Sequence, residues 1–196
     1  MSSTTPTKWV VVLPVKPLRE GKSRLSPLGV TARRTLLSAF LRDTLTAVVG
    51  TRDVIETFVV SVDDEILQTG LRHGAKSIAD PGEGLSAAVE AAADACRAGE
   101  GDRGFAVVPA DLPCLTSAVL TDLLRAASSG TDPWFFVPDV AGSGTTVLAA
   151  PRARPVACYG AGSAIAHAAA GGVPLIARRR ARLDVDTPAD LQAALQ

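Results

Sequence analysis

The sequence predicts an α/β fold: a single-domain, three-layer sandwich in which helices cover both faces of a mostly parallel sheet. Short apolar runs alternate with segments of helical period, which is the pattern of consecutive βαβ units. The first run, residues 9–15 (WVVVLPV), is continuously apolar, as expected for a strand buried on both faces. Two strands flank a Gly-rich turn within residues 133–151, which predicts one antiparallel excursion.

The first half of the chain supplies the elements of this fold in order. After a polar stretch over residues 16–28, apolar residues recur with helical spacing over 31–49, and Gly50 stands where a helix ends. Residues 54–62 and 75–79 are expected strands, and between them Asp63 can cap a helix that runs to Arg72. An Ala-rich helix is expected over 85–98.

The second half continues the alternation to the end of the chain. Strands are expected at 105–109, 134–137, 145–149 and 174–176, and helices at 116–127 and 163–170. The last helix begins at Thr187 and Pro188, because proline suits the first turn. Without a linker the chain forms one domain over residues 1–196, with residues 1–7 as a flexible tail.

Composition excludes several classes of protein. Lys and Arg number 20 and Asp and Glu number 20, so the zero net charge argues against a general nucleic-acid binder. Aromatic residues are only 4% of the chain, which argues against an aromatic platform on which nucleic-acid bases stack. The three cysteines are scattered, and no apolar run reaches membrane-spanning length. Because residues 1–7 are polar, a secretory leader is not expected. A cytoplasmic protein without membrane contact is expected.

Basic residues, glycines and carboxylates gather at one edge of the predicted sheet. Ligands of such sheets bind beyond the carboxyl ends of the strands. Lys16, Lys22 and Arg24 follow the first strand, so they can clamp a triphosphate or form a solvated basic loop. Asp111 directly follows a buried strand, where a carboxylate can hold Mg²⁺ on a nucleotide or can serve a turn or a helix cap.

A second pair of carboxylates lies in the segment 183–188. Strand alternation would place Asp184 and Asp186 on one face, about 7 Å apart. Two such carboxylates repel unless a cation lies between them. Asp186 also has a plain structural interpretation, as the cap of the last helix.

Two glycine motifs and two histidines carry weaker signals. Gly21-Lys22-Ser23 resembles the end of a Walker A loop but lacks its first glycine, since Lys16 stands there. Residues 82–87 match the permissive dinucleotide pattern GxGxxA, but a glycine turn into a helix is favoured. His73 is expected to close a helix and His167 to lie in an Ala-rich turn. The absence of a GxSxG motif disfavours a serine hydrolase.

Taken together, the motifs resemble the CofC/FbiD family of phospholactate or phosphoenolpyruvate guanylyltransferases, which have a MobA-like nucleotidyltransferase fold. The similarity runs from about Val10 to Leu191 and rests on seven segments: 13–18, 21–25, 61–64, 84–88, 109–113, 142–145 and 184–191. One departure is Ser86, where the family usually has Asn.

The resemblance implies a step of coenzyme F420 biosynthesis. GMP passes from GTP to phosphoenolpyruvate or 2-phospho-L-lactate, and pyrophosphate is released. It further implies that Mg²⁺, as two ions, is held by Asp111, Asp184 and Asp186, and that Thr145, Gly160 and Ser163 bind the small phosphorylated three-carbon acid. Lys16, Lys22 and Arg24 would act on the phosphates. The implied nucleotide-binding residues are Leu13, Pro14, Val15, Asp63, Gly82, Gly84, Leu85, Ser86 and Pro109.

Three alternatives stay open from the sequence. One is a related MobA-like or sugar-phosphate nucleotidyltransferase with the same fold, although Thr145, Gly160 and Ser163 suit a small acid better than a bulky substrate. Another is a catalytically silent nucleotide-binding regulatory module, against which the three candidate metal carboxylates speak. The third concerns the acid, because phosphoenolpyruvate, 2-phospho-L-lactate and 3-phosphoglycerate differ only by small groups. The oligomeric state, a homodimer included, is also open.

Overall fold

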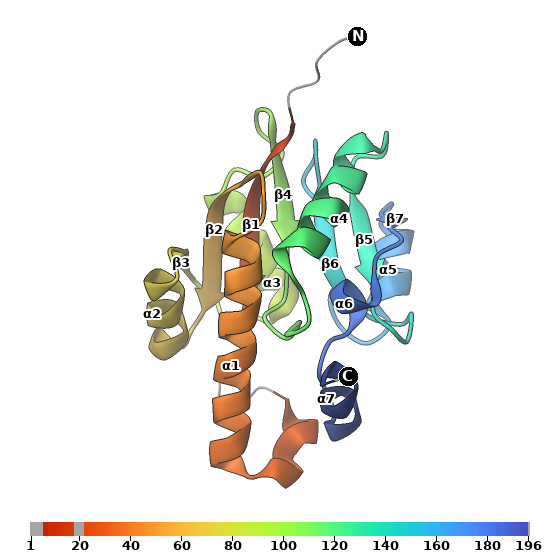
Figure 1. Cartoon of the computed structure of the whole chain (residues 1–196). Helices are drawn as coiled ribbons and strands as arrows, with labels where there is room; N and C mark the ends of the chain where they lie inside the picture. Colours follow the sequence, from red (N-terminus) through yellow and green to blue (C-terminus); the bar gives the residue numbers. More distant parts are fainter. Residues whose placement is uncertain (1–5, 18–21, 196) are drawn as a thin grey trace.

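The computed structural model describes residues 6–17 and 22–195, and these form one seven-stranded sheet with helices on both faces (Figure 1). The strand order is β3-β2-β1-β4-β6-β5-β7. The strands are β1 (Lys8–Pro14), β2 (Val54–Ser61), β3 (Lys76–Ala79), β4 (Arg103–Val107), β5 (Phe135–Pro138), β6 (Thr145–Ala150) and β7 (Val173–Pro174). The helices are η1 (Ser23–Leu28), α1 (Val30–Val49), α2 (Asp64–Arg72), α3 (Leu85–Ala95), α4 (Ser117–Ser129), α5 (Ser163–Ala169), α6 (Arg179–Arg182) and α7 (Pro188–Ala194).

The sheet is parallel except at β6, as the sequence predicts. β1 pairs in parallel with β2 and β4, and β6 runs antiparallel to both β4 and β5. The Gly-rich turn between β5 and β6 reverses the chain and causes this excursion. The carboxyl ends of β1, β2 and β4 therefore reach the same edge of the sheet, and η1 and α7 lie at that end of the molecule (Figure 1).

Alternation along the strands builds two apolar layers. One face of the sheet presents Val11 and Leu13 to α1, α2, α4 and α6, and the other presents Val10 and Val12 to α3 and α5. All four of these β1 side chains are at most 2% exposed, which explains why the segment is apolar without alternation. The prediction of a buried central strand is confirmed.

The structure differs from the sequence expectations in several short segments, among them β4, which was expected at 105–109 and lies at 103–107. Residues 23–28 belong to the stretch for which the sequence indicates only polarity, and they form the 3₁₀ helix η1. Pro27 is tolerated inside it because Leu25 and Gly29 still donate backbone hydrogen bonds. The Arg-rich helix α6 was not expected. The strand expected at 174–176 is shorter and lies at 173–174. None of the helices in the described part of the chain is long and apolar enough to cross a membrane.

Candidate active site at the carboxyl edge of the sheet

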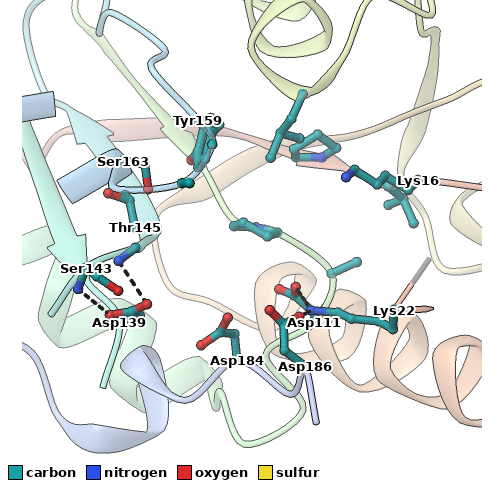
Figure 2. A pocket seen from close by; sticks show the side chains of 18 of the residues that line it. Lys16, Lys22, Asp111, Asp139, Ser143, Thr145, Tyr159, Ser163, Asp184 and Asp186 are labelled. Carbon is teal, nitrogen blue, oxygen red and sulfur yellow. Dashed lines mark hydrogen bonds and ion pairs between the residues drawn. The ribbon is translucent and has the colours of Figure 1, made fainter. Parts of the chain in front are cut away.

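A cavity of about 740 Å³ opens at the edge where β1 and β4 end (Figure 2). Figure 2 shows Lys16 and Lys22 on one side of the cavity and Thr145, Tyr159 and Ser163 on the other, with three aspartates between them. The lining residues are Pro14, Val15, Lys16, Lys22, Arg24, Leu37, Leu85, Pro109, Ala110, Asp111, Asp139, Ser143, Gly144, Thr145, Tyr159, Gly160, Ala161, Gly162, Ser163, Asp184 and Asp186.

Three carboxylates form a cluster on the floor of this cavity. Asp111, Asp184 and Asp186 each offer an oxygen, and these oxygens lie within 4.8 Å of one another. A backbone hydrogen bond of 3.2 Å from Val185 N–H to the Asp111 carbonyl joins the segment after α6 to the loop after β4. This single bond places the aspartates on either side of Val185 beside Asp111. Carboxylate oxygens gathered in this way are the ligands that Mg²⁺ prefers in proteins.

The details of the second carboxylate pair differ from the expectation. Residues 183–186 belong to no strand, so strand alternation is not what brings the two carboxylates together, although one oxygen of each lies within 4.8 Å of the other. Asp186 does not cap α7 either. Thr187 is the N-cap, and Asp190 completes a capping box with it, which leaves the Asp186 carboxylate directed into the cavity.

Lys22 bridges the carboxylate cluster. Its backbone has a left-handed φ of 57°, and its ammonium group lies 2.5 Å from the Asp111 carboxylate and also contacts Asp186. Burial by itself lowers the pKa of Lys22, but the charges and hydrogen bonds of the two aspartates outweigh it and hold the pKa above its usual range. Lys22 is therefore a fixed positive charge at the edge of the cluster.

The pKa of Asp184 reports the electrostatic repulsion within the cluster. Burial, followed by the charges of Asp111 and Asp186, raises the pKa of Asp184 to about 6, although Lys22 acts in the opposite direction. The single positive charge of Lys22 therefore does not neutralise the three carboxylates. A divalent cation among them would relieve the repulsion, so the residues present fit such an ion.

The opposite wall is built by two loops. Asp139 organises the first: its carboxylate accepts hydrogen bonds from Ser143 N–H at 3.0 Å and Gly144 N–H at 2.9 Å, which fixes the turn that leads into Thr145. The second loop, residues 159–162, leads into α5, and the first turn of this helix is joined to the first loop where Ala164 N–H donates to the Ser143 carbonyl at 3.1 Å. Thr145, Gly160 and Ser163 therefore line one part of the cavity, although Thr145 lies on a different segment from the other two.

Sequence reasoning missed Asp139 and Tyr159. Asp139 precedes a Gly-Ser-Gly turn, and an aspartate that accepts from the backbone of such a turn is a recognisable signal. Tyr159 offered no such signal. Its ring lines the cavity, while its hydroxyl is buried and has no hydrogen-bond partner among the described residues, and burial raises its pKa above the usual range.

The expected nucleotide-binding residues lie at different distances from the cavity. Pro14, Val15, Leu85 and Pro109 line it. Leu13, Asp63, Gly82, Gly84 and Ser86 are absent from its lining among the described residues. Asp63 caps α2 by accepting from Glu65 N–H at 3.0 Å. Ser86 reaches the site indirectly, because its hydroxyl accepts from Tyr159 N–H at 3.0 Å.

The two glycine motifs have structural explanations. Gly84 is the N-cap of α3 with a φ of 97°, so residues 82–87 form the favoured glycine turn into a helix. Lys22 precedes a 3₁₀ helix rather than the α-helix of a Walker A loop, and Gly21 lies outside the described residues.

His167 was expected in a turn and is instead a fully buried residue of α5.

The fold defines a structural class that includes nucleotidyltransferases. The fold matches a 4-diphosphocytidyl-2C-methyl-D-erythritol synthase with a TM-score of 0.64 and 15% identity over 97% of this chain and 100% of the other. It also matches a cytidylyltransferase from Leptospira borgpetersenii with a TM-score of 0.60 and 12% identity over 94% and 84%. At these identities the likeness concerns the fold.

The sequence comparisons identify the family within this class. Residues 9–192 match the family model "Guanylyl transferase CofC like", so the chain belongs to this family. A phosphoenolpyruvate guanylyltransferase from Geodermatophilus obscurus is 40% identical over 95% of this chain and 88% of the relative. One from Streptomyces avermitilis is 40% identical over 96% and 88%.

Proposed function

We propose that this protein transfers GMP from GTP to phosphoenolpyruvate and releases pyrophosphate, as a step of coenzyme F420 biosynthesis. The observation that carries the proposal is the division of one cavity into two parts. Lys22 and three aspartates form one part, and Thr145 and the loop 159–163 form the other. Such a cavity suits a nucleoside triphosphate bound beside a small acid. Membership of the family and the activity named for its relatives support the same reaction.

Asp111, Asp184 and Asp186 are proposed to hold Mg²⁺, as two ions. Bound there, the metal supplies positive charge to the phosphates of GTP and to the departing pyrophosphate. The protein contributes the position of the three carboxylates, which the Val185–Asp111 backbone bond keeps together. It also contributes Lys22, whose ammonium group stays at the edge of the cluster.

The cations after β1 have different tasks in this proposal. Lys22 is largely buried, so its charge is screened little and acts strongly on a phosphate in the cavity. Lys16 and Arg24 line the cavity but are exposed, so they attract the triphosphate with weaker, salt-dependent interactions. The three together offset the repulsion between two anionic substrates.

The acid is proposed to bind opposite the aspartates. The hydroxyls of Thr145 and Ser163 are neutral donors for its carboxylate. The backbone N–H of Ser163 is used within its own loop, where it donates to the Gly160 carbonyl at 3.2 Å. Donors from the backbone therefore come from residues 160–162, where the φ of Gly160 is 147° and a Cβ would face open space.

The reaction then needs no protein nucleophile. A phosphate oxygen of the acid forms a bond to the α-phosphorus of GTP while the bond from that phosphorus to the oxygen of the β-phosphate breaks. The electron pair of the broken bond leaves with pyrophosphate. The residues of the chain position the two substrates and stabilise charge, which is how most phosphoryl-type transfers are catalysed.

A substrate panel tests this proposal. Pyrophosphate release with Mg²⁺ is measured for GTP, ATP and CTP, each with phosphoenolpyruvate, 2-phospho-L-lactate or 3-phosphoglycerate. We expect GTP with phosphoenolpyruvate to give the highest kcat/KM. Preference for another nucleotide, or turnover only with a sugar phosphate added to the panel, would contradict the proposed function and indicate a related nucleotidyltransferase. No turnover with any pair would favour the regulatory module.

A further inference from the structure

His167 occupies a buried position directly behind the cavity wall. It lies in α5 and is 0% exposed, enclosed by the rings of Trp134, Phe136 and Tyr159 at centroid distances of 6.0, 5.9 and 5.2 Å. A buried polar ring needs partners for both nitrogens, because an unpaired one carries a large desolvation cost. Both nitrogens of His167 have such partners.

The partners of the ring fix its tautomer. Cys158 N–H donates to Nε2 at 2.9 Å, so Nε2 carries no proton and the ring is neutral. A neutral imidazole then carries its single proton on Nδ1. Burial also lowers the pKa of His167, which favours the same neutral form, while a backbone hydrogen bond to Ser163 acts in the opposite direction.

The tautomer in turn fixes the hydroxyl of Thr145. The Thr145 Oγ1 lies 2.8 Å from Nδ1, and because Nδ1 is protonated the oxygen must accept. A protonated Nδ1 has no free lone pair, so the hydroxyl hydrogen of Thr145 cannot be donated to it. That hydrogen is free to point away from His167, and Thr145 lines the cavity.

We propose that His167 is a positioning residue that holds the Thr145 hydroxyl as a donor toward the carboxylate of the acid substrate. The inference rests on the proposed function, in which Thr145 binds that carboxylate. Hydrogen bonds run from Cys158 N–H through the imidazole to Thr145. One ring therefore positions both the backbone at Cys158, just before the acid-binding loop, and the hydroxyl of Thr145.

Two substitutions separate positioning from packing. The carboxamide of His167→Asn places a nitrogen donor near the position of Nδ1, whereas that of His167→Gln reaches the position of Nε2. We expect His167→Gln to raise the KM for phosphoenolpyruvate at least roughly tenfold, the effect of misplacing one donor to a charged acceptor, with the KM for GTP unchanged. His167→Asn should stay within about threefold of the wild type.

His73 provides the matched control. It closes α2 and is not among the residues that line the cavity, and its Nδ1 contacts only the Thr69 carbonyl among the partners described for its ring. His73→Gln should leave both KM values unchanged. Equal increases in the KM for the acid with His167→Asn and His167→Gln would show a packing role and overturn the proposal.

A double-mutant cycle tests whether the effect passes through Thr145. In a Thr145→Val background, His167→Gln should raise the KM for the acid no further, because the hydroxyl that it positions is gone. Additive effects would overturn the proposal. If Thr145→Val alone leaves the KM for the acid unchanged, the assignment of Thr145 fails. If Thr145→Val raises it but His167→Gln does not, only the positioning role fails.

The tautomer itself is measurable without substrate or activity. The chain contains two histidines, so ¹⁵N-histidine labelling gives signals from two imidazole rings, with two nitrogens each, and His73→Gln removes one ring from the spectrum. The shifts of the remaining ring at neutral pH should show a protonated Nδ1 and an unprotonated Nε2. A ring protonated at Nε2, or at both nitrogens, would overturn the proposal even if every His167 variant failed to fold.

Discussion

The ammonium group of Lys22 lies 2.5 Å from the carboxylate of Asp111, a residue 89 positions further along the chain. The contact joins the segment after β1 to the loop after β4, two neighbouring parallel strands whose carboxyl ends meet at one edge. The Lys22 side chain is 13% exposed and that of Asp111 is 27% exposed, so water screens the pair only partly. Removing either partner should therefore affect the charge balance of the whole cluster.

Asp111→Asn should abolish turnover while leaving the fold intact. The substitution keeps the size of the side chain but removes one negative charge from the proposed metal site, which should lower activity by at least about 10²-fold. Pyrophosphate release at saturating Mg²⁺ measures this, and the melting temperature reports the fold. Asp122→Asn is the control, since Asp122 is an exposed residue of α4. Turnover of Asp111→Asn near that of the control would contradict the assignment.

Lys22→Ala should reduce the use of GTP more than Lys16→Ala does. Loss of the part-buried Lys22 charge should lower kcat/KM for GTP at least roughly tenfold, while exposed Lys16 should have a smaller effect that shrinks with added salt. Lys8→Ala is the control, because Lys8 pairs with Asp53 at the start of β1, at the opposite end of that strand. Values within about twofold of the control for both variants would make this segment a solvated basic loop.

Ser163→Ala should raise the KM for the acid and leave that for GTP unchanged. Ser163 is 3% exposed and lies in the cavity wall, and loss of one neutral donor to a carboxylate should weaken binding roughly 10- to 150-fold. Separate titrations with GTP and with the acid measure the two affinities. Weaker binding of GTP with unchanged binding of the acid would place Ser163 in the nucleotide part of the cavity.

Gly160→Ala should impair binding of the acid through the backbone. The φ of 147° is one that residues with a Cβ rarely adopt, so alanine should strain or shift the loop at a cost of roughly 1–3 kcal/mol. Direct steric contact with the protein is not the cause, since a Cβ at this position meets nothing within 4 Å. The KM for the acid checks the expectation, and an unchanged value would show that the loop tolerates the substitution.

Mg²⁺ should stabilise the protein more as the pH rises through about 6, the pKa of Asp184. Below that pH the carboxyl group is protonated in the folded protein, and the metal must displace the proton. Without metal the sign is opposite: the folded state holds a proton that the unfolded state has released, so stability falls as the pH rises from 3.8 toward 6.

Melting curves with and without Mg²⁺ at about pH 5 and about pH 7.5 measure both effects. The increase in melting temperature caused by Mg²⁺ should be larger at the higher pH. Asp184→Asn should make that increase less dependent on pH. A larger increase at the lower pH would contradict this account of the cluster.

The sequence predicts those site residues whose signal is local. Asp111 was predicted to follow an apolar strand directly; β4 ends at Val107, four residues earlier, but the loop after it still carries Asp111 to the carboxyl edge of the sheet. Asp184 and Asp186 were also predicted to act together, but through strand alternation. Their actual arrangement depends on the bond between Val185 and Asp111, which joins residues 74 positions apart and leaves no pattern in either segment.

Residues defined by packing could not be predicted in this way. His167 lies among alanines in the sequence, and only the fold brings it to Thr145 and encloses it with three aromatic rings. Its neutral charge follows from an acceptor role toward Cys158 N–H, which no spacing rule reveals. The same holds for Ser86 of α3, whose hydroxyl accepts a hydrogen bond from the backbone N–H of Tyr159.

Mass spectrometry of the reaction with GTP, phosphoenolpyruvate and Mg²⁺, combined with pyrophosphate quantification, tests the proposed guanylyl transfer most directly. The account predicts one pyrophosphate for each GTP consumed and a product whose mass equals GMP joined to phosphoenolpyruvate with loss of water. It also predicts that omitting either the acid or Mg²⁺ stops the release of pyrophosphate. Release that continues without the acid, with free GMP as the product, would contradict guanylyl transfer and identify a hydrolase.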